Sequence, residues 1–368
     1  MHKIMDRKIR GKDLNIVGIV GKNGKSTIAQ IHHHCYTELG KCSKVGSVVE
    51  FFVESYENSE KDVIIEASLC AIKGKKASYV DFDSLIFSNT PKDASLDELW
   101  TMKRPFIALP LEKTAIINID DENGIAFCNV TIASIITYAV NRPADINARN
   151  IKLAIDKTVF DLYYKGSFAC RVETPYFGIY NIYNTLTAIA HLISIGYDPE
   201  KIAQLLVDLP QIEGRFDSFL TESGIRVVVD YGRNPEAVGA VLKSLATVCR
   251  GNIITVIGAD ANTTAVERSS IGKNALMYSK QVVFTTDNSR KEDAQSIIYD
   301  IIKGNVRQNY RICIDREKAI EVALNMAKPK DVVILFGKGH EKTQLIGEKT
   351  RFFCDKKTAS YLVEKYDI

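Results

Sequence analysis

A short glycine-containing turn near the start of the chain carries the residues best suited to bind phosphate. The turn spans 21–27 and reads Gly-Lys-Asn-Gly-Lys-Ser-Thr, between an apolar run over 16–20 and a predicted helix over 26–39. Gly21 and Gly24 allow the backbone to bend tightly and to present its N–H groups to an anion. The pattern predicts a strand, a phosphate-binding loop and the start of a helix.

The side chains that close this turn complete the chemistry of an ATP site. Lys25 supplies a cation that can reach the terminal phosphates, and the hydroxyls of Ser26 and Thr27 can bind a magnesium ion. The helix dipole favours negative charge at this end. Ile19 stands where the strict phosphate-loop pattern has its first glycine, so an ordinary strand–turn–helix with a surface lysine is the alternative.

A second polar position lies toward the end of a buried strand that is predicted over 62–68. Glu66 lies in its C-terminal part, at the end where ligands collect in parallel α/β sheets. Its carboxylate could hold a second metal ion or position the water of the metal. A solvated carboxylate at a strand end is the alternative. A further strand, predicted over 115–121, ends in the polar pair Asp120 and Asp121.

Length and composition are those of a globular protein with two or three domains. The 368 residues are 46% hydrophobic and 25% charged, and the net charge of +3 argues against nucleic acid as a main partner. The eight cysteines include no C-x-x-C pair, and we expect free thiols in a reducing cytoplasm. No apolar run approaches membrane-spanning length, so we expect no membrane partner.

The order of the predicted elements divides the chain at a linker over 210–216. Strands and helices precede the linker, and they alternate regularly again from residue 225 onward. The sequence therefore predicts an α/β fold with two domains. A central ATPase domain with a phosphate loop and a parallel-rich sheet covers 1–210, and a Rossmann-like, doubly wound domain covers 211–368.

Four predicted elements before the linker bear on the candidate site. They are a strand over 45–53, a helix over 96–103 that ends in Lys103, a hairpin over 151–172 and a helix over 181–195. The last of these carries two asparagines in its first turn.

The phosphate loop resembles the Gly-x-Asn-Gly-Lys-Ser/Thr-Thr variant of the Mur ligase superfamily, and further matches follow in the family's order. The matching segments are Glu66-Ala-Ser, 115–121, Asn181-Ile-Tyr-Asn184, Glu213-Gly-Arg215, 229–235, Asp287-Asn-Ser-Arg290 and Phe336-Gly-Lys-Gly-His-Glu341. The last two are similar to the MurE-type branch, which adds the third peptide residue to UDP-MurNAc-dipeptide. Together the matches cover nearly the whole chain.

The resemblance implies an ATP-dependent amide-bond ligase with ATP and Mg²⁺ as cofactors. ATP would phosphorylate the carboxylate of a small-molecule acceptor, and an amino acid or another amine would attack the acyl phosphate. The catalytic residues implied are Lys25, Glu66 and Lys103. The metal ligands implied are Ser26, Glu66 and, if it is carbamylated, Lys103; a plain exposed lysine is the alternative at that position.

The same resemblance implies two further sets of binding residues. The nucleotide set is Gly21, Asn23, Gly24, Lys25, Ser26, Thr27, Asn184, Arg215, Asp230 and Arg233. Within it, Asp230 would bind the ribose and Arg215 a phosphate. The set for the incoming amine is Asn288, Arg290, Gly337, His340 and Glu341. The forked guanidinium of Arg290 suits a carboxylate, and Glu341 would hold an amine.

Three departures from the family pattern bear on this interpretation. The phosphate loop starts near residue 18, so we expect the N-terminal UDP-binding domain to be absent and the acceptor to differ from a UDP-sugar peptide bound in the usual manner. The Asp-His motif before the carbamylated lysine is missing, so Asp93 or water would replace one metal ligand. Arg233 stands where the family has a histidine.

Two other functions stay open from the sequence. The chain could be an ATP-binding subunit whose catalysis is weakened or depends on a protein partner, which the missing histidine favours. A plain P-loop ATPase or kinase is the third possibility, but it leaves 287–290 and 337–341 unexplained.

Overall fold

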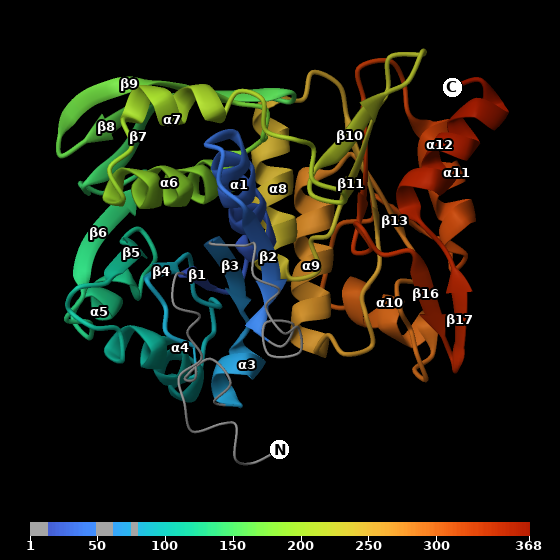
Figure 1. Cartoon of the computed structure of the whole chain (residues 1–368). Coiled ribbons are helices and arrows are strands. Elements are labelled where there is room, and N and C mark those ends of the chain that lie inside the picture. The colour runs from blue at the N-terminus through green and yellow to red at the C-terminus, as the bar shows by residue number, and fades with distance from the viewer. Residues whose placement is uncertain (1–13, 49–61, 75–79) are drawn as a thin grey trace. The chain divides into compact units, whose positions relative to one another are not determined.

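The structure, a computed structural model, describes residues 14–48, 62–74 and 80–368. The chain forms two compact units that divide between Pro210 and Gln211 (Figure 1). Each unit is built on a mainly parallel sheet with helices packed against it, which confirms the α/β fold class. Among the described residues, no helix combines the length and the apolar character needed to cross a bilayer.

The first unit contains a nine-stranded sheet in the order β2-β3-β1-β4-β5-β6-β7-β8-β9. All neighbouring strands from β2 to β7 in this order, β1 included, pair in parallel. Strands β8 and β9 extend the sheet with antiparallel pairing. The strands are β1 (Asn15–Val20), β2 (Ser43–Ser47), β3 (Asp62–Ala67), β4 (Ser84–Phe87), β5 (Thr114–Asn118), β6 (Ser134–Ala139), β7 (Ile146–Ala154), β8 (Lys157–Tyr164) and β9 (Ser167–Thr174).

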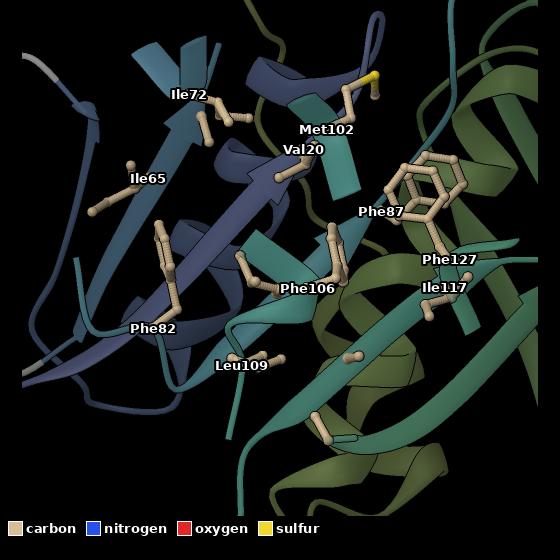
Figure 2. Packing of buried hydrophobic residues seen from close by; sticks show 14 of the residues in the cluster. Val20, Ile65, Ile72, Phe82, Phe87, Met102, Phe106, Leu109, Ile117 and Phe127 are labelled. Carbon is tan, nitrogen blue, oxygen red and sulfur yellow. The ribbon is translucent and has the colours of Figure 1, made fainter. Parts of the chain in front are cut away.

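The helices of the first unit bury the apolar residues of this sheet. They are α1 (Lys25–Glu38), α3 (Leu69–Lys73), α4 (Leu96–Ile107), α5 (Gly124–Cys128), α6 (Ile179–Ser194) and α7 (Pro199–Leu205). Helix α1 packs on α6 and on the first strands. Figure 2 shows the core to which α4 contributes Phe106 and α5 contributes Phe127. The ring of Phe127 stacks on Phe87 at 3.8 Å between centroids and is nearly perpendicular to the ring of Phe106.

The strand register brings the candidate phosphate site to one edge of the sheet. Strand β1 lies between β3 and β4, with Ile19 opposite Glu66 and Val20 opposite Phe87. Because all three strands run in parallel, their carboxyl ends open at the same edge. The loop after β1, the end of β3 and the residues after β4 therefore lie side by side.

Three elements differ from the sequence prediction. The hairpin expected over 151–172 is a three-stranded meander of β7, β8 and β9, because a second tight turn follows β8 with positive φ at Lys165. Helix α4 continues past residue 103 to Ile107 and tolerates Pro105 within its last turn. The strand expected over 45–53 ends at Ser47, and its part beyond residue 48 lies outside the described residues.

The second unit contains a six-stranded sheet in the order β10-β11-β15-β12-β13-β14, parallel except for β10. The strands are β10 (Asp217–Leu220), β11 (Arg226–Asp230), β12 (Ile253–Ile257), β13 (Gln281–Phe284), β14 (Tyr310–Ile312) and β15 (Val332–Phe336), with a separate hairpin of β16 (Thr343–Ile346) and β17 (Lys349–Phe352). The helices are α8 (Pro235–Val248), α9 (Ala265–Tyr278), α10 (Ala294–Ile302), α11 (Arg316–Met326) and α12 (Asp355–Tyr366).

Short or exposed elements of the second unit escape the sequence prediction. Strand β10 and the β16–β17 hairpin are not predicted from the sequence. Each of these three strands is only four residues long, and β17 is exposed at every residue, so the sequence shows too little hydrophobic alternation to indicate them. Helix α9 begins six residues before the predicted start at 271, where Thr264 and Glu267 form a capping box.

Candidate active site

Two glycines shape the loop between β1 and α1. Gly24 precedes the first residue of α1 with φ of +88°, and a Cβ there would lie 2.4 Å from Oδ1 of Asn184. A Cβ on Gly21 would lie 1.9 Å from Oγ of Ser88. No side chain caps the start of α1, so the helix presents backbone N–H groups in the manner of an anion site.

The residues that follow the neighbouring strand β4 hold the loop by hydrogen bonds. The backbone N–H of Asn23 donates to Oδ1 of Asn89 at 2.9 Å, and Nδ2 of Asn89 donates back to the carbonyl of Asn23 at 3.0 Å. The N–H of Lys22 donates to the carbonyl of Asn89, and the hydroxyl of Ser88 donates to the carbonyl of Asn23. Ser88 and Asn89 are not among the residues predicted from the sequence, although polar residues at the end of a buried strand are the signal that could have indicated them.

The lysine of the loop lies against the loop itself. Nζ of Lys25 donates to the carbonyl of Gly21 at 2.8 Å and to that of Lys22 at 3.1 Å. The ammonium is therefore placed at the same bend as the N–H groups at the start of α1. This adds a full positive charge to the partial charge of the helix terminus.

A hydroxyl and a carboxylate meet beside the loop. Oγ of Ser26 donates to Oε2 of Glu66 at 3.0 Å, as the pairing of β1 with β3 dictates. These are ligand types that Mg²⁺ accepts, and Mg²⁺ commonly takes only one or two protein ligands besides phosphate and water. The described residues include no group of three or more His, Cys, Asp or Glu that could hold a metal ion. The residues present thus fit a magnesium ion completed by a nucleotide.

Helix α6 contributes buried amides to the same loop. Nδ2 of Asn184 donates to Oδ1 of Asn181 at 2.9 Å, and Nδ2 of Asn181 donates to the carbonyl of Phe177. Both asparagines are buried. This chain of amides fixes Oδ1 of Asn184 against Gly24, so the structure brings Asn184 to the loop where the sequence expects it.

Asp120 connects the N-terminal part of α6 to the ends of β5 and β6. Its Oδ2 accepts the N–H of Val140 at 2.6 Å, the N–H of Asn141 at 2.7 Å and the hydroxyl of Tyr183 at 2.8 Å. Its Oδ1 is buried and has no hydrogen-bond partner in the described structure. Burial and the Asp120 carboxylate raise the pKa of Tyr183, so its phenol stays protonated as a donor.

Two residues expected near a second metal ion have other surroundings. Lys103 of α4 is half-buried, and its Nζ lies 5.7 Å above the centroid of the Phe127 ring, a contact that uses the positive charge. Asp93 is exposed in a turn before α4. A carbamate on Lys103 stays a prediction.

In the second unit, the ring of Tyr231 contacts the side chains of two arginines and one histidine. The guanidinium carbons of Arg215 and Arg233 each lie 4.4 Å from the centroid of its ring. The ring of His340 lies 4.8 Å away, centroid to centroid. Partial burial and the charge of Arg215 lower the pKa of His340, so its imidazole is neutral at physiological pH.

Asp230 is buried at the end of β11 and anchors the chain around it. Its Oδ1 accepts the N–H of Gly232 at 2.7 Å, and its Oδ2 accepts the N–H of Phe216 at 2.8 Å. Burial raises the pKa of this carboxyl although both backbone donors oppose the shift. The structure thus gives Asp230 a role in holding the turn that carries Arg215, and a ribose contact stays a prediction.

Charged side chains cluster at the carboxyl edge of the second sheet. Oε1 of Glu341 accepts a hydrogen bond from Nη2 of Arg233, and Oε2 accepts from Nζ of Lys338 at 3.0 Å and from Nδ2 of Asn288 at 3.2 Å. Lys338 also donates to Oδ1 of Asn288 at 3.1 Å and lies 3.5 Å from Oδ1 of Asp287. Lys338 is part of a recognised motif, but no role is predicted for it from the sequence.

Arg290 lies in the same cluster in a conformation that few residues other than glycine adopt. Its φ is +51°, and its N–H donates to the carbonyl of Leu345. Nε and Nη2 donate to the two oxygens of Asp260 at 3.2 and 3.3 Å. Burial would raise the pKa of the Asp260 carboxyl, but Arg290 and neighbouring donors outweigh it and hold that pKa low.

Gly337 leaves room for a buried carboxylate. Its φ is +107°, and a Cβ there would lie 2.8 Å from Oδ2 of Asp287. That oxygen is buried without a hydrogen-bond partner in the described structure. The second unit therefore brings together Asn288, Arg290, Gly337 and Glu341, whereas the ring of His340 lies on Tyr231.

Comparison with known proteins matches both units. Residues 19–192 match the Mur ligase middle domain, and residues 214–339 match the domain described as Mur ligase, glutamate ligase domain. Similar curated proteins include the UDP-N-acetylmuramoyl-L-alanyl-D-glutamate–2,6-diaminopimelate ligases of Clostridioides difficile (31% identical, covering 95% of this chain and 79% of that protein) and Halalkalibacterium halodurans (27%, covering 96% and 79%).

Solved structures share the fold. A UDP-N-acetylmuramoyl-L-alanyl-D-glutamate–2,6-diaminopimelate ligase matches with a TM-score of 0.68 at 22% identity, over 97% of this chain and 80% of that one. The MurF ligase of Thermotoga maritima in complex with ADP matches with a TM-score of 0.74 at 15% identity, over 96% and 80%.

Proposed function

The chain belongs to the Mur ligase family, whose members are ATP-dependent, ADP-forming ligases, and we propose that it joins an amino acid or another amine to the carboxylate of a small-molecule acceptor. The observation that carries the proposal is the contact of Ser26 with Glu66 beside the Lys25 loop. A hydroxyl, a carboxylate and an ammonium at one bend are the parts that phosphoryl transfer requires.

In the first step the phosphate loop would hold ATP while its γ-phosphoryl group passes to a carboxylate oxygen of the acceptor. The products are ADP and an acyl phosphate. The N–H groups at the start of α1 and the ammonium of Lys25 would stabilise the charge that develops on the phosphoryl oxygens. Ser26 and Glu66 would hold Mg²⁺, which supplies further positive charge to the same oxygens when it is bound.

In the second step the amine nitrogen would attack the acyl carbon, and phosphate would leave as the new C–N bond forms and the amine loses a proton. We assign the amine to the charged cluster of the second unit. There Arg290 and Asn288 are suited to a carboxylate of the amine substrate, because a guanidinium offers paired N–H donors. We assign Arg215 and Asp230 to the nucleotide.

One candidate acceptor comes from the names of the relatives. The named relatives act on UDP-N-acetylmuramoyl-L-alanyl-D-glutamate, and that compound is the first acceptor to test. We also place the protein in the cytoplasm, because its eight cysteines are all unpaired thiols. A partner-dependent subunit is the second candidate function, and the position of Lys103 over Phe127 favours it.

The experiment is a measurement of ADP and phosphate release by the purified full chain with ATP, Mg²⁺, pooled amino acids and candidate acceptors, with products identified by mass spectrometry. We expect release that requires both an acceptor and an amine, and a product heavier than the acceptor by one amine residue. ATP hydrolysis that is indifferent to both would contradict a ligase. Release that appears only with an added protein would favour the partner-dependent subunit.

A further inference from the structure

The β16–β17 hairpin lies against the segment that carries Asn288 and Arg290. The N–H of Leu345 in β16 donates to Oδ1 of Asn288 at 3.0 Å, and the carbonyl of Leu345 accepts the N–H of Arg290 at 3.1 Å. Arg290 and Ile346 also form an isolated parallel bridge. The backbone of β16 therefore fixes both the side chain of Asn288 and the backbone of Arg290, the two residues assigned to the carboxylate of the amine.

The side chain of Gln344 adds a second connection from the same strand. It is fully buried, and its Nε2 donates to the carbonyl of Asp287 at 2.9 Å and to that of Thr286 at 3.2 Å. Its Oε1 accepts hydrogen bonds of 2.9 and 2.7 Å from Nε and Nη2 of Arg351, which lies directly opposite Gln344 in the hairpin. Both polar atoms of the buried amide are therefore hydrogen-bonded, as a stable core position requires.

A carboxamide suits this position because it donates at one end and accepts at the other. The backbone carbonyls need a donor, and the guanidinium of Arg351 needs an acceptor. If the amide were flipped, its NH2 group would face the guanidinium and its oxygen would face the carbonyls, which is unfavourable on both sides. Arg351 therefore orients Gln344, although Arg351 itself is exposed.

Arg290 needs such support because its backbone is strained. Its φ of +51° lies in the left-handed region that a residue with a side chain rarely adopts. A conformation of this kind persists where the surrounding structure holds it. The backbone of β16 holds Arg290 directly, and Gln344 holds the preceding Thr286 and Asp287. The directions of the Arg290 and Asn288 side chains thus depend on the hairpin.

We propose that Gln344 is a positioning residue for the amine substrate and that Arg351 acts through it. The pair holds residues 286–290 in the conformation in which Asn288 and Arg290 receive a carboxylate. The inference rests on the proposed function, because it concerns the amine of that reaction. It gives an exposed arginine of a surface hairpin a role in substrate binding.

Two substitutions at Gln344 and one at Arg351 separate these contacts. Gln344→Glu keeps the shape and the acceptor for Arg351 but removes the N–H donors to the two carbonyls. Gln344→Met keeps the length and removes both kinds of contact, and Arg351→Ala removes the guanidinium. The matched control is Glu348→Ala, which breaks an exposed ion pair of 2.9 Å between the same hairpin and Lys291. Exposed pairs of this kind contribute little to stability.

Hydrogen–deuterium exchange of the full chain without substrates measures how firmly the segment is held. We expect the backbone N–H groups of 287–291 to exchange about tenfold faster in all three variants than in the wild type and the control, the effect of losing one or two ordinary hydrogen bonds. Exchange in the buried strand β12 should change little. Unchanged exchange over 287–291 would overturn the inference, and so would an equal acceleration in β12, which would show a general loss of stability.

ADP release measures the consequence for the reaction, with UDP-N-acetylmuramoyl-L-alanyl-D-glutamate, ATP, Mg²⁺ and a pool of amino acids that includes meso-diaminopimelate. We expect the apparent KM for the pool to rise about tenfold in the three variants, while the KM for ATP changes less than about twofold. Equal increases in both constants, or an unchanged KM for the pool, would contradict the positioning role. If the wild type shows no amine-dependent release, the proposed function fails, and the exchange measurement alone decides whether the hairpin holds the segment.

Discussion

The side chain of Asn89 pairs with the backbone of Asn23 in both directions, as one strand pairs with another. The carboxamide accepts from the N–H of Asn23 at 2.9 Å and donates to its carbonyl at 3.0 Å. Asn23 lies within the phosphate loop, so residues after β4 hold the shape of this loop before any nucleotide binds. Such preorganisation removes part of the ordering cost of binding.

Replacing Asn89 by alanine should weaken ATP binding more than it weakens folding. The change removes two hydrogen bonds to the loop, each contributing about 0.5–1.5 kcal/mol. We therefore expect the Kd for ATP to rise roughly tenfold, with little change in the thermal midpoint, because the loop is at the edge of the core. Calorimetry with ATP measures the first and thermal unfolding the second. Asn129→Ala, at an exposed asparagine of the same unit, is the control, and an unchanged Kd in Asn89→Ala would refute the loop-holding role.

Sequence alone predicts the phosphate loop and the alternation of strands and helices, because both depend on local patterns. The contact of Asn89 with Asn23 depends on β4 lying beside β1, a pairing that no local pattern specifies. The same limit applies to Arg233. Its motif suggests a place near the nucleotide, whereas its side chain reaches Glu341, which is 108 residues away in the chain. Residues near a motif are predictable, but the direction of a long side chain depends on tertiary packing.

Lys25→Ala should abolish ADP release while the protein stays folded. The substitution removes the ammonium that donates to the carbonyls of Gly21 and Lys22 at the bend of the loop. Because this charge would stabilise the transferring phosphoryl group, we expect a loss of turnover on the order of a thousandfold or more. Lys22→Ala removes an exposed lysine of the same loop and should retain most of the activity. Wild-type turnover in Lys25→Ala would show that phosphoryl transfer does not use this loop.

A buried ion pair in the second unit contacts the backbone next to the charged cluster. Arg316 of α11 and Asp355 of α12 are both fully buried and share two hydrogen bonds of 2.8 and 2.7 Å. Arg316 also donates to the carbonyl of Phe336 at 2.7 Å, directly before Gly337. A longer contact of 3.5 Å reaches the carbonyl of Thr286, directly before Asp287. One guanidinium thus braces both segments that carry the charged cluster.

Arg316→Met should destabilise the protein by about 3–5 kcal/mol, because Asp355 would remain buried without a partner. The double variant Arg316→Met/Asp355→Leu should regain much of that stability in urea unfolding but should bind the amine more weakly than the wild type, since the carbonyls of Phe336 and Thr286 still lack their donor. Arg311→Ala, at an exposed position, should change stability by less than about 0.5 kcal/mol. Full amine affinity in the double variant would limit the role of the pair to folding.

Two buried histidines join the helices that carry Lys25 and Asn184. His32 of α1 and His191 of α6 are wholly buried, with ring centroids 5.2 Å apart. The ring N–H of His32 at Nδ1 donates to the carbonyl of Ile28. Neither nitrogen of His191 has a hydrogen-bond partner in the described structure. Burial lowers the pKa of His32 to about 4 and lowers the pKa of His191 well below its ordinary value, so both rings are neutral in the folded protein.

Stability should therefore fall with acidification, and His191→Phe should reduce that fall. The unfolded chain takes up protons below its histidine pKa of about 6.5, while the folded protein does not until about pH 4 at His32, so stability is complete above pH 6.5 and is lost between these values. His32 alone accounts for a loss on the order of 3 kcal/mol by pH 4. Phenylalanine keeps a ring in the same space and removes one titrating group. Urea unfolding at pH 7.5 and 5.0 should show a smaller difference in His191→Phe than in the wild type, whereas an equal difference would assign the acid sensitivity to other groups.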